Sequence, residues 1–262
     1  MKKLWKVFIS VCMIFGLVAC GGSGSSSQEK SYVTRDEIPS VFKDPNAYKG
    51  KYIKLSGKIF NKSGDGYQIW QDPVNSENDF YVIAPSDEFQ TDDYVKVDGR
   101  IDGVAEGTNA FGGQVSVLQI GNAKMEKSSY IDIVVPTKTA LEPKISQEQS
   151  GITVSVEKVE FAEKETRVYM TVKNDSSADF DLSNYDIKIL QDGKQIEQDD
   201  SSMSRYDGKY PELPYEIVSG VSTEGILVFP VLDAEKDFQI IAEGWTQDTY
   251  EELRFTLDVK AK

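Results

Sequence analysis

The sequence contains no histidine and only two cysteines among its 262 residues. Histidine is the commonest general base and the commonest zinc ligand in proteins, so its absence removes both roles at once. The two cysteines are Cys12 and Cys20, so the chain beyond them has no disulfide and no cysteine metal site. The stability of the folded part must therefore come from hydrophobic cores, and some 230 residues are enough for two ordinary domains.

The hydrophobic run near the start of the chain, 7–18, is shorter than the about 20 residues that span a bilayer. It follows three lysines (positions 2, 3 and 6) and precedes the small residue Ala19. A positive start, a short apolar run and a small residue before the cleavage point are the features of a secretory signal peptide. We therefore expect residues 1–19 to be a signal peptide.

The motif LVAC at 17–20, followed by Gly21, resembles the lipobox of bacterial lipoproteins. In that family the cysteine receives a diacylglyceryl group, the chain is cut before it, and its new amine is often acylated, for example with palmitate. Two or more acyl chains give stable attachment without a spanning helix. The resemblance implies lipid attachment at Cys20 and a location on the extracellular face of the cell membrane. An ordinary signal peptide cut near a cysteine is the less favoured alternative.

The stretch GGSGSSS at 21–27 has no side chains to bury and is typical of a flexible coil. With the residues that follow, it predicts a tether over 20–31 with a root-mean-square reach of roughly 15–20 Å.

Charge is unevenly distributed along the chain, whose formal net charge is −14. Residues 31–128 carry 11 Lys and Arg against 15 Asp and Glu, and residues 129–262 carry 14 against 27. Such an acidic distal half does not attract polyanions by itself and is typical of a solubilising surface.

A helix is expected directly after the tether. Thr34 and Glu37 have the spacing of a capping box, and the apolar residues that follow give the helix one hydrophobic side. The helix should end before Asp44, because Pro45 disfavours helical geometry at the residue preceding it.

From residue 51 the hydrophobic pattern changes to a period of two, which predicts β-strands. The strands are expected at 51–60, 67–70, 79–84, 92–103 and 114–120, and five strands of this rhythm fit a small closed barrel. The segments AYKGKYIKLSGKI and DYVKVDGRIDG resemble sequences of the oligonucleotide/oligosaccharide-binding (OB) fold, particularly versions in bacterial envelope proteins. The resemblance covers residues 32–126.

Residues 127–150 lack a sustained period and are expected to connect two domains, although YIDIVV at 130–135 has the composition of an edge strand. Strands then resume over 151–262 and predict an antiparallel sandwich. Residues 168–195 and 218–231 resemble an immunoglobulin-like, telokin-like domain of unknown function in Gram-positive lipoproteins. This family implies an extracellular sandwich used in interaction, and it supplies no reaction.

Two motifs with catalytic or metal-binding relatives have simpler explanations. Ser40–Lys43 and Ser155–Lys158 match the Ser-x-x-Lys motif of penicillin-recognising enzymes, but the partner motifs of that family are missing. The segment 61–72 imitates a calcium loop, yet strands flank it rather than helices, so a hairpin turn is favoured over loose calcium binding. We expect no enzyme activity, no cofactor and no metal site.

The outward side of the predicted barrel combines aromatic and basic residues. Such combinations bind single-stranded nucleic acid, and exposed aromatic rings also stack on sugars. Ordinary exposed strand positions account for the same residues and remain the favoured explanation. The candidate ligand-binding residues are Tyr52, Lys54, Lys58, Trp70, Tyr94, Lys96 and Arg100, with Ser56 beside them.

Together these features predict a mainly β protein, with an OB-like five-stranded barrel followed by an immunoglobulin-like sandwich. The expected function is that of a membrane-anchored, non-enzymatic binding or scaffolding module of the cell envelope. Its partner would be the membrane together with an envelope protein or glycan. The alternative is capture of single-stranded nucleic acid or cell-wall glycan by the face of the barrel.

Overall fold

The computed structural model describes residues 30–84, 87–108 and 112–261. The predicted signal peptide, Cys20 and most of the tether lie outside these residues. Contacts divide the chain into two units, Met1–Ser31 and Tyr32–Lys262, and only the second is described below. Within the described residues, no helix is both long and apolar enough to cross a membrane.

The first elements are helical and begin at the predicted capping box. Glu37 accepts hydrogen bonds from the backbone N–H of Thr34 at 2.8 Å and from its hydroxyl at 3.0 Å. The first turn, η1, is a 3-10 helix over Arg35–Glu37, and α1 continues over Ile38–Lys43. The predicted end before Asp44 is confirmed, and η2 (Pro45–Tyr48) leads into the barrel.

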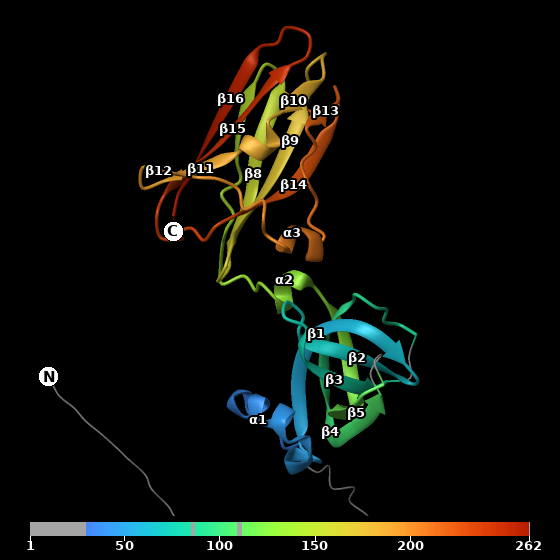
Figure 1. Ribbon diagram of the computed structural model, residues 1–262. Coiled ribbons are helices and arrows are strands. Elements are labelled where there is room, and N and C mark those ends of the chain that lie inside the picture. The colour runs from blue at the N-terminus through green and yellow to red at the C-terminus, as the bar shows by residue number, and fades with distance from the viewer. Residues whose placement is uncertain (1–29, 85–86, 109–111, 262) are drawn as a thin grey trace, which may run out of the picture. The chain divides into compact units, whose positions relative to one another are not determined.

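A closed barrel of five strands follows, as the alternating pattern predicts (Figure 1). Around the barrel the order is β1-β2-β3-β5-β4, and all neighbours are antiparallel except β3 and β5, which are parallel. The strands are β1 (Tyr52–Ser63), β2 (Gly66–Asp72), β3 (Glu77–Ile83), β4 (Tyr94–Thr108) and β5 (Gln114–Ser128).

The interior of the barrel is filled by the apolar half of each alternating pattern. Ile53 and Ile59 of β1, and Val95 and Ile101 of β4, have no exposed surface. Their sequence neighbours point outward, because successive side chains of a strand lie on opposite faces of a sheet. The residues considered as a ligand site therefore occupy the outside of the barrel.

The segment after the barrel differs from the expectation at two points. Residues 130–135 were expected to form an edge strand, but Tyr130–Ile133 forms the short helix α2 instead. The helix is capped by Ser129, whose hydroxyl accepts a hydrogen bond from the backbone N–H of Asp132 at 3.1 Å. The rest of this stretch contains β6 (Thr139–Leu141) and β7 (Ile145–Gln149), and both pair with β8 (Ile152–Phe161).

Two antiparallel sheets make up the C-terminal region and share one hydrophobic core. The first sheet joins β6 to β8 with β9 (Thr166–Asn174) and β14 (Ser222–Phe229). The second sheet contains β10 (Phe180–Leu182), β11 (Lys188–Gln191), β12 (Lys194–Ile196), β13 (Glu216–Ile217), β15 (Phe238–Thr246) and β16 (Glu252–Val259). Two short helical turns, η3 (Asn184–Asp186) and α3 (Ser204–Asp207), lie in the connections.

Strands resume after residue 151, as expected, and turns and short helical segments separate them. Tyr185 and Asp186 belong to η3, so β11 begins only at Lys188. The turn between β11 and β12 uses Asp192 and Gly193, at φ of +53° and +71°. Positive φ at both central residues is what a two-residue type I′ hairpin requires, and it explains the Asp-Gly pair in the sequence.

Candidate functional site

Strand register brings the predicted ligand-binding residues together on one surface, which we call the barrel face. Along β1 and β4, Tyr52 lies opposite Arg100, and Ser56 lies opposite Lys96. Lys58 has Tyr94 on one side and Trp70 of β2 on the other. The residues chosen from alternation alone therefore share one continuous face over β2, β1 and β4.

Tyr94 lies on this face but is not available to a ligand, which corrects the expectation. Its side chain is buried, with its ring edge-on to that of Tyr130 in α2 at 5.7 Å between centroids. Burial raises the pKa of Tyr94 well above its usual value. Alternation placed Tyr94 on the outside of the barrel correctly but gave no sign that α2 covers it.

Three of the four predicted cations already have carboxylate partners, and the first of them, Lys54, lies 3.7 Å from Asp98. Lys58 is mostly buried and forms an ion pair with Asp92 at 3.0 Å. Arg100 donates a hydrogen bond to Asp102 at 2.8 Å. Each pair reduces the charge that these residues can offer a ligand.

The predicted aromatic residues are also engaged within the protein. The Trp70 ring stacks on Phe60, with centroids 4.3 Å apart and planes 13° from parallel. The Tyr52 ring lies 5.7 Å from that of Tyr32. The faces that would stack on a base or sugar are thus partly occupied by other side chains.

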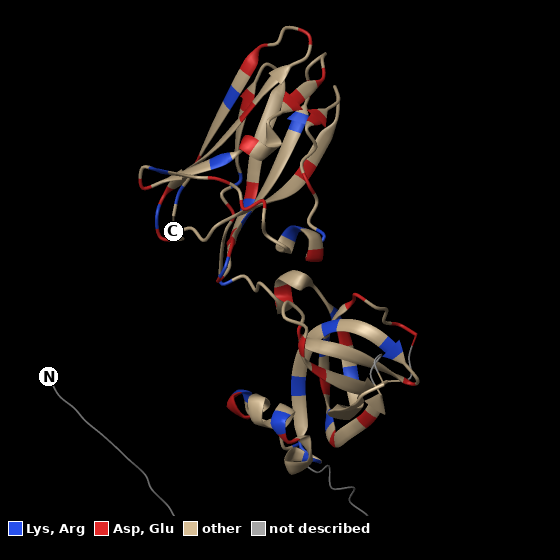
Figure 2. Ribbon diagram, viewed as in Figure 1, with Lys and Arg blue, Asp and Glu red and all other residues tan. Residues whose placement is uncertain are grey.

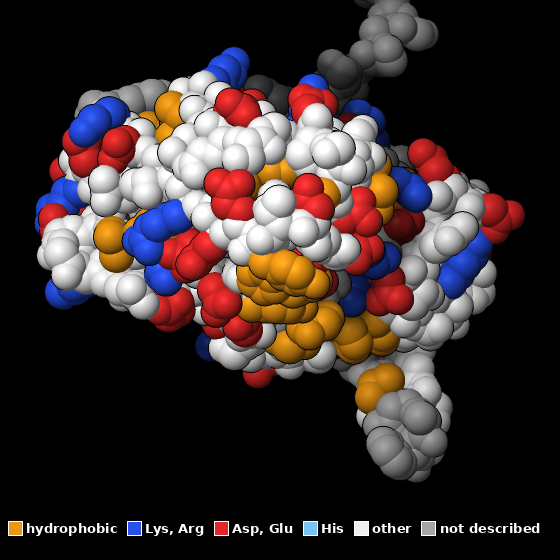
Figure 3. Space-filling view, turned by 90° about the horizontal axis from the view of Figure 1, so that it is seen from above, with side chains coloured by type: hydrophobic (Ala, Val, Ile, Leu, Met, Phe, Trp, Pro, Cys, Tyr) orange, Lys and Arg blue, Asp and Glu red, His pale blue; other side chains and the backbone are white. Residues whose placement is uncertain are grey.

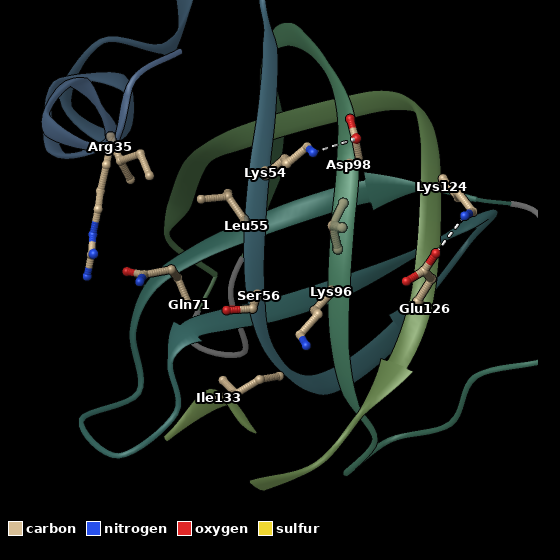
Figure 4. Close-up of a pocket in the computed structure, with 12 residues that line it drawn as sticks. Arg35, Lys54, Leu55, Ser56, Gln71, Lys96, Asp98, Lys124, Glu126 and Ile133 are labelled. Carbon is tan, nitrogen blue, oxygen red and sulfur yellow. Dashed lines mark hydrogen bonds and ion pairs between the residues drawn. The ribbon is translucent and has the colours of Figure 1, made fainter. Parts of the chain in front are cut away.

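A groove with a volume of about 710 Å³ crosses the barrel face over β1, β4 and β5, and we call it the cation groove (Figure 4). Its basic side chains come from four elements, namely η1 and these three strands. The groove is lined by Arg35, Ile38, Lys54, Leu55, Ser56, Gln71, Lys96, Val97, Asp98, Lys124, Glu126 and Ile133.

The two carboxylates of the cation groove are already paired. Lys54 lies 3.7 Å from Asp98, whose carboxylate also accepts a hydrogen bond from the Tyr32 hydroxyl at 2.9 Å. Lys124 donates to Glu126 at 2.6 Å, and this hydrogen bond lowers the pKa of Glu126. Both ion pairs are well exposed, and exposed pairs contribute only about 0–1 kcal/mol to stability.

Arg35 and Lys96 differ from the other cations of the groove. Both are exposed, and neither lies within 4.0 Å of a carboxylate of any described residue. Across the strands, Lys96 is flanked by Ser56 and by Glu126, which is itself hydrogen-bonded to Lys124. The groove therefore has a net positive charge, on a protein whose formal net charge is −14.

Sequence reasoning missed four polar residues of the groove: Arg35, Gln71, Lys124 and Glu126. Lys124 and Glu126 belong to β5, which the sequence predicts to end at residue 120 but which continues to Ser128. Charged residues at alternating positions in 122–128 were the signal that would have extended this strand. Arg35 had no such signal, because only the fold brings η1 beside the strands.

A second hollow of about 550 Å³ lies elsewhere on the barrel and has the opposite charge. Asp79 and Glu106 line it with the rings of Phe60 and Tyr81, and none of its described lining residues is a lysine or arginine. Figure 2 shows how basic and acidic residues are distributed over the barrel strands. An anionic ligand thus has one favourable groove on the barrel and one unfavourable hollow.

Hydrophobic side chains gather in one surface patch bordered by carboxylates (Figure 3). In the C-terminal region, Tyr215 is 48% exposed and Val218 is 49% exposed. The Tyr215 ring lies edge-on to Trp245 at 5.9 Å between centroids. Exposed apolar patches are typical of protein contacts, but none of the described residues indicates what would cover this one.

The two catalytic or metal-like motifs fall in ordinary structural settings. Ser155 and Lys158 lie in β8, and the segment 61–72 forms the hairpin of β1 and β2, which confirms the favoured interpretation of that segment. Among the described residues, no three His, Cys, Asp or Glu side chains are grouped to hold a metal ion.

Comparisons with known proteins do not identify this chain. No protein-family model matches the sequence, and no curated protein does either. A protein of unknown function from Listeria monocytogenes EGD-e is similar over 49% of this chain and 88% of its own, with 16% identity and a TM-score of 0.37. A conserved domain protein from Bacillus anthracis is similar over 81% of this chain and 77% of its own, with 12% identity and a TM-score of 0.35. At TM-scores this low, neither structure indicates the family of this chain or what it binds.

Proposed function

We propose that this protein is a lipid-anchored, extracytoplasmic binding module without enzymatic activity, and that the cation groove is its ligand site. One observation carries the proposal. Two exposed cations that line the same groove of a strongly acidic protein, Arg35 and Lys96, lie more than 4.0 Å from every carboxylate of the described residues. A groove whose lining has a net positive charge attracts an anionic ligand electrostatically.

The fold supports a binding role of this kind. The barrel order β1-β2-β3-β5-β4, with β3 and β5 parallel, is the observation in favour of an OB-like fold, a fold used to bind polymers. Two antiparallel sheets around one core favour an immunoglobulin-like assignment of the C-terminal region. Fold alone does not give a function, so the proposal rests on the chemistry of the groove.

The anchor is proposed from the sequence. The lysines, short apolar run, Ala19, Cys20 and Gly/Ser stretch agree with one another as parts of a lipoprotein start. A Cys20→Ser chain should lose both palmitate labelling in bacterial cells and its place in the membrane fraction. Unchanged labelling and fractionation would contradict the anchor.

The ligand site is tested by amide NMR spectra of residues 30–262. The spectra are recorded during titration with a soluble peptidoglycan fragment, an anionic wall-polymer fragment and a short oligothymidine. We expect at least one envelope component to shift amides of Lys54, Lys96 and Lys124 together. No shift in the groove with any of them, or with bilayers that contain anionic lipid, would refute this ligand site.

A matched pair of variants separates the groove from overall charge. Lys96→Glu reverses a charge in the groove, and Lys194→Glu makes the same change on exposed β12. Lys96→Glu should weaken binding about tenfold or more, whereas Lys194→Glu should leave it within about twofold. Equal losses would assign the binding to net charge rather than to the groove.

A further inference from the structure

The chain enters the barrel at the rim of the cation groove. Tyr32 forms a parallel bridge with Tyr52, and the backbone N–H of Val33 donates to the Tyr52 carbonyl at 2.8 Å. The Tyr32 hydroxyl donates to Asp98, a residue of the groove, and the Lys54 ammonium lies 5.3 Å from the centre of the Tyr32 ring. Tyr32 thus fixes the entry point of the chain beside Lys54 and Asp98.

This entry point limits the distance between the groove and an anchor at Cys20. Eleven residues separate Cys20 from Tyr32. Covalent geometry limits a segment of that length to about 40 Å at full extension. An anchor at Cys20 would therefore keep Tyr32, and the groove beside it, within about 40 Å of the membrane surface.

The donors of the groove suit phosphate oxygens. The guanidinium of Arg35 presents paired N–H groups that match phosphate geometry, and Lys96 supplies a compact positive charge. Ser56 and Gln71 add a hydroxyl and an amide that donate hydrogen bonds without adding charge. A phosphodiester carries one negative charge and several acceptor oxygens, which is the complement of this set.

The same groove is poorly suited to single-stranded nucleic acid. Proteins that bind single strands combine cations with aromatic rings on which successive bases stack. None of the described residues that line the groove is aromatic. Of the nearby rings, Tyr52 packs against Tyr32, Trp70 stacks on Phe60 and Tyr94 is buried. The groove offers charge and hydrogen bonds but no stacking platform.

We infer that the cation groove binds the phosphodiester headgroups of anionic membrane lipids and so lays the barrel against the membrane that holds Cys20. The inference rests on the proposed function, because it takes both the anchor and the groove from it.

The contact can be weak and still be occupied. Each cation close to an anionic bilayer raises binding about fivefold, so a groove with two unpaired cations binds only weakly by itself. Attachment through a short linker raises the effective concentration of a binding site at a surface to about millimolar. The anchor therefore supplies the proximity, and the groove selects which side of the barrel meets the membrane.

The test uses residues 20–262 without acyl chains, because acyl chains would attach the protein to any bilayer, and lipid nanodiscs at concentrations that detect weak binding. One set of nanodiscs contains phosphatidylcholine alone, and the other also contains phosphatidylglycerol. We expect amide shifts confined to the groove and the rim around Tyr32, present only with phosphatidylglycerol and lost at high salt. Lys96→Glu should weaken this binding more than fivefold, and Lys194→Glu should change it less than twofold.

Each of the following results would overturn the inference. The first is equal binding to both kinds of nanodisc, and the second is an equal loss for Lys96→Glu and Lys194→Glu. The third is full binding of soluble glycerophosphoglycerol in place of the bilayer, which would make the ligand a free phosphodiester. If neither kind of nanodisc shifts amide signals of the groove but a wall fragment does, the inference is wrong and the proposed function stands. If no probe shifts amide signals of the groove, both the inference and the proposed ligand site are wrong.

Discussion

The guanidinium of Arg167 donates a hydrogen bond to the carboxylate of Glu165 at 2.7 Å, and its side chain has no exposed surface. The same guanidinium donates to Glu160 at 3.0 Å, to the Val135 carbonyl at 3.0 Å and to the Thr137 hydroxyl at 2.7 Å. A buried cation is tolerated only when its donors are satisfied, and here four partners share them. Arg167 thereby joins the segment after α2 to β8 and β9.

Replacing Arg167 should destabilise the protein strongly. Arg167→Met keeps much of the side-chain volume but leaves two mostly buried carboxylates without their partner. Loss of one member of a buried ion pair costs about 3–5 kcal/mol. We expect the free energy of unfolding, measured in urea, to fall by about that amount. Arg254→Met is the control, because the pair of Arg254 with Glu243 is exposed and should be worth about 0–1 kcal/mol. Similar losses for both would contradict the importance of burial here.

The same cluster predicts a dependence of stability on pH. Burial by itself raises the pKa of Glu160, but hydrogen bonds from Lys158, Tyr169 and Arg167 outweigh it and lower the pKa overall. A carboxyl whose pKa is lower in the folded state stabilises the fold above its unfolded pKa, about 4.3. That contribution is lost as the pH falls through the folded pKa.

The wild type should therefore lose more stability than Glu160→Gln as the pH falls from about 5 to about 3. Urea unfolding at a series of pH values measures the difference. Glu160→Gln should already be less stable at pH 7, where the wild-type carboxylate is ionised. Parallel pH curves for the two proteins would show that Glu160 does not provide this stabilisation.

We predict that Gly57, in β1, does not tolerate a side chain. A Cβ there would lie 2.0 Å from the Trp70 carbonyl oxygen and 2.7 Å from the Ile69 side chain, so a neighbouring strand would have to shift. Gly57→Ala should cost about 3 kcal/mol or more of unfolding free energy. Gly107→Ala is the matched control, since its nearest neighbour would be a Val115 methyl group at 3.7 Å. Equal stability of the two variants would show that the barrel wall yields easily at β1.

Local sequence patterns predicted the elements of this fold well. The five barrel strands follow from alternation, because a strand with one buried face must repeat its apolar residues every second position. Thr34 and Glu37 identified the start of the helical segment, and the Asp192-Gly193 pair has the composition of the hairpin turn that it forms. Each of these signals lies within a few residues of the feature it specifies.

The features that were missed depend on residues far apart in the sequence. Tyr94 is buried by Tyr130 of α2, and Arg35 joins the groove because η1 lies beside the strands. The strand that contains Arg167 gives no sign that this cation is buried, because its carboxylate partners belong to β8 and to the turn before β9. The outward positions of the barrel face were predictable from the sequence. Which of its cations form ion pairs with carboxylates was not.

Trp70 provides a test of whether the aromatic part of the barrel face is structural. Its ring stacks on Phe60, so Trp70→Ala should remove this stack and lower the free energy of unfolding by about 1–3 kcal/mol. Ligand affinity of the cation groove should change less than about twofold, because Trp70 does not line it. Trp70→Phe keeps a ring against Phe60 and should recover much of the stability. Urea unfolding and the NMR titration measure the two properties separately. If Trp70→Ala instead weakens binding at unchanged stability, the ring stacks on the ligand, and the ligand has a flat face that a lipid headgroup lacks.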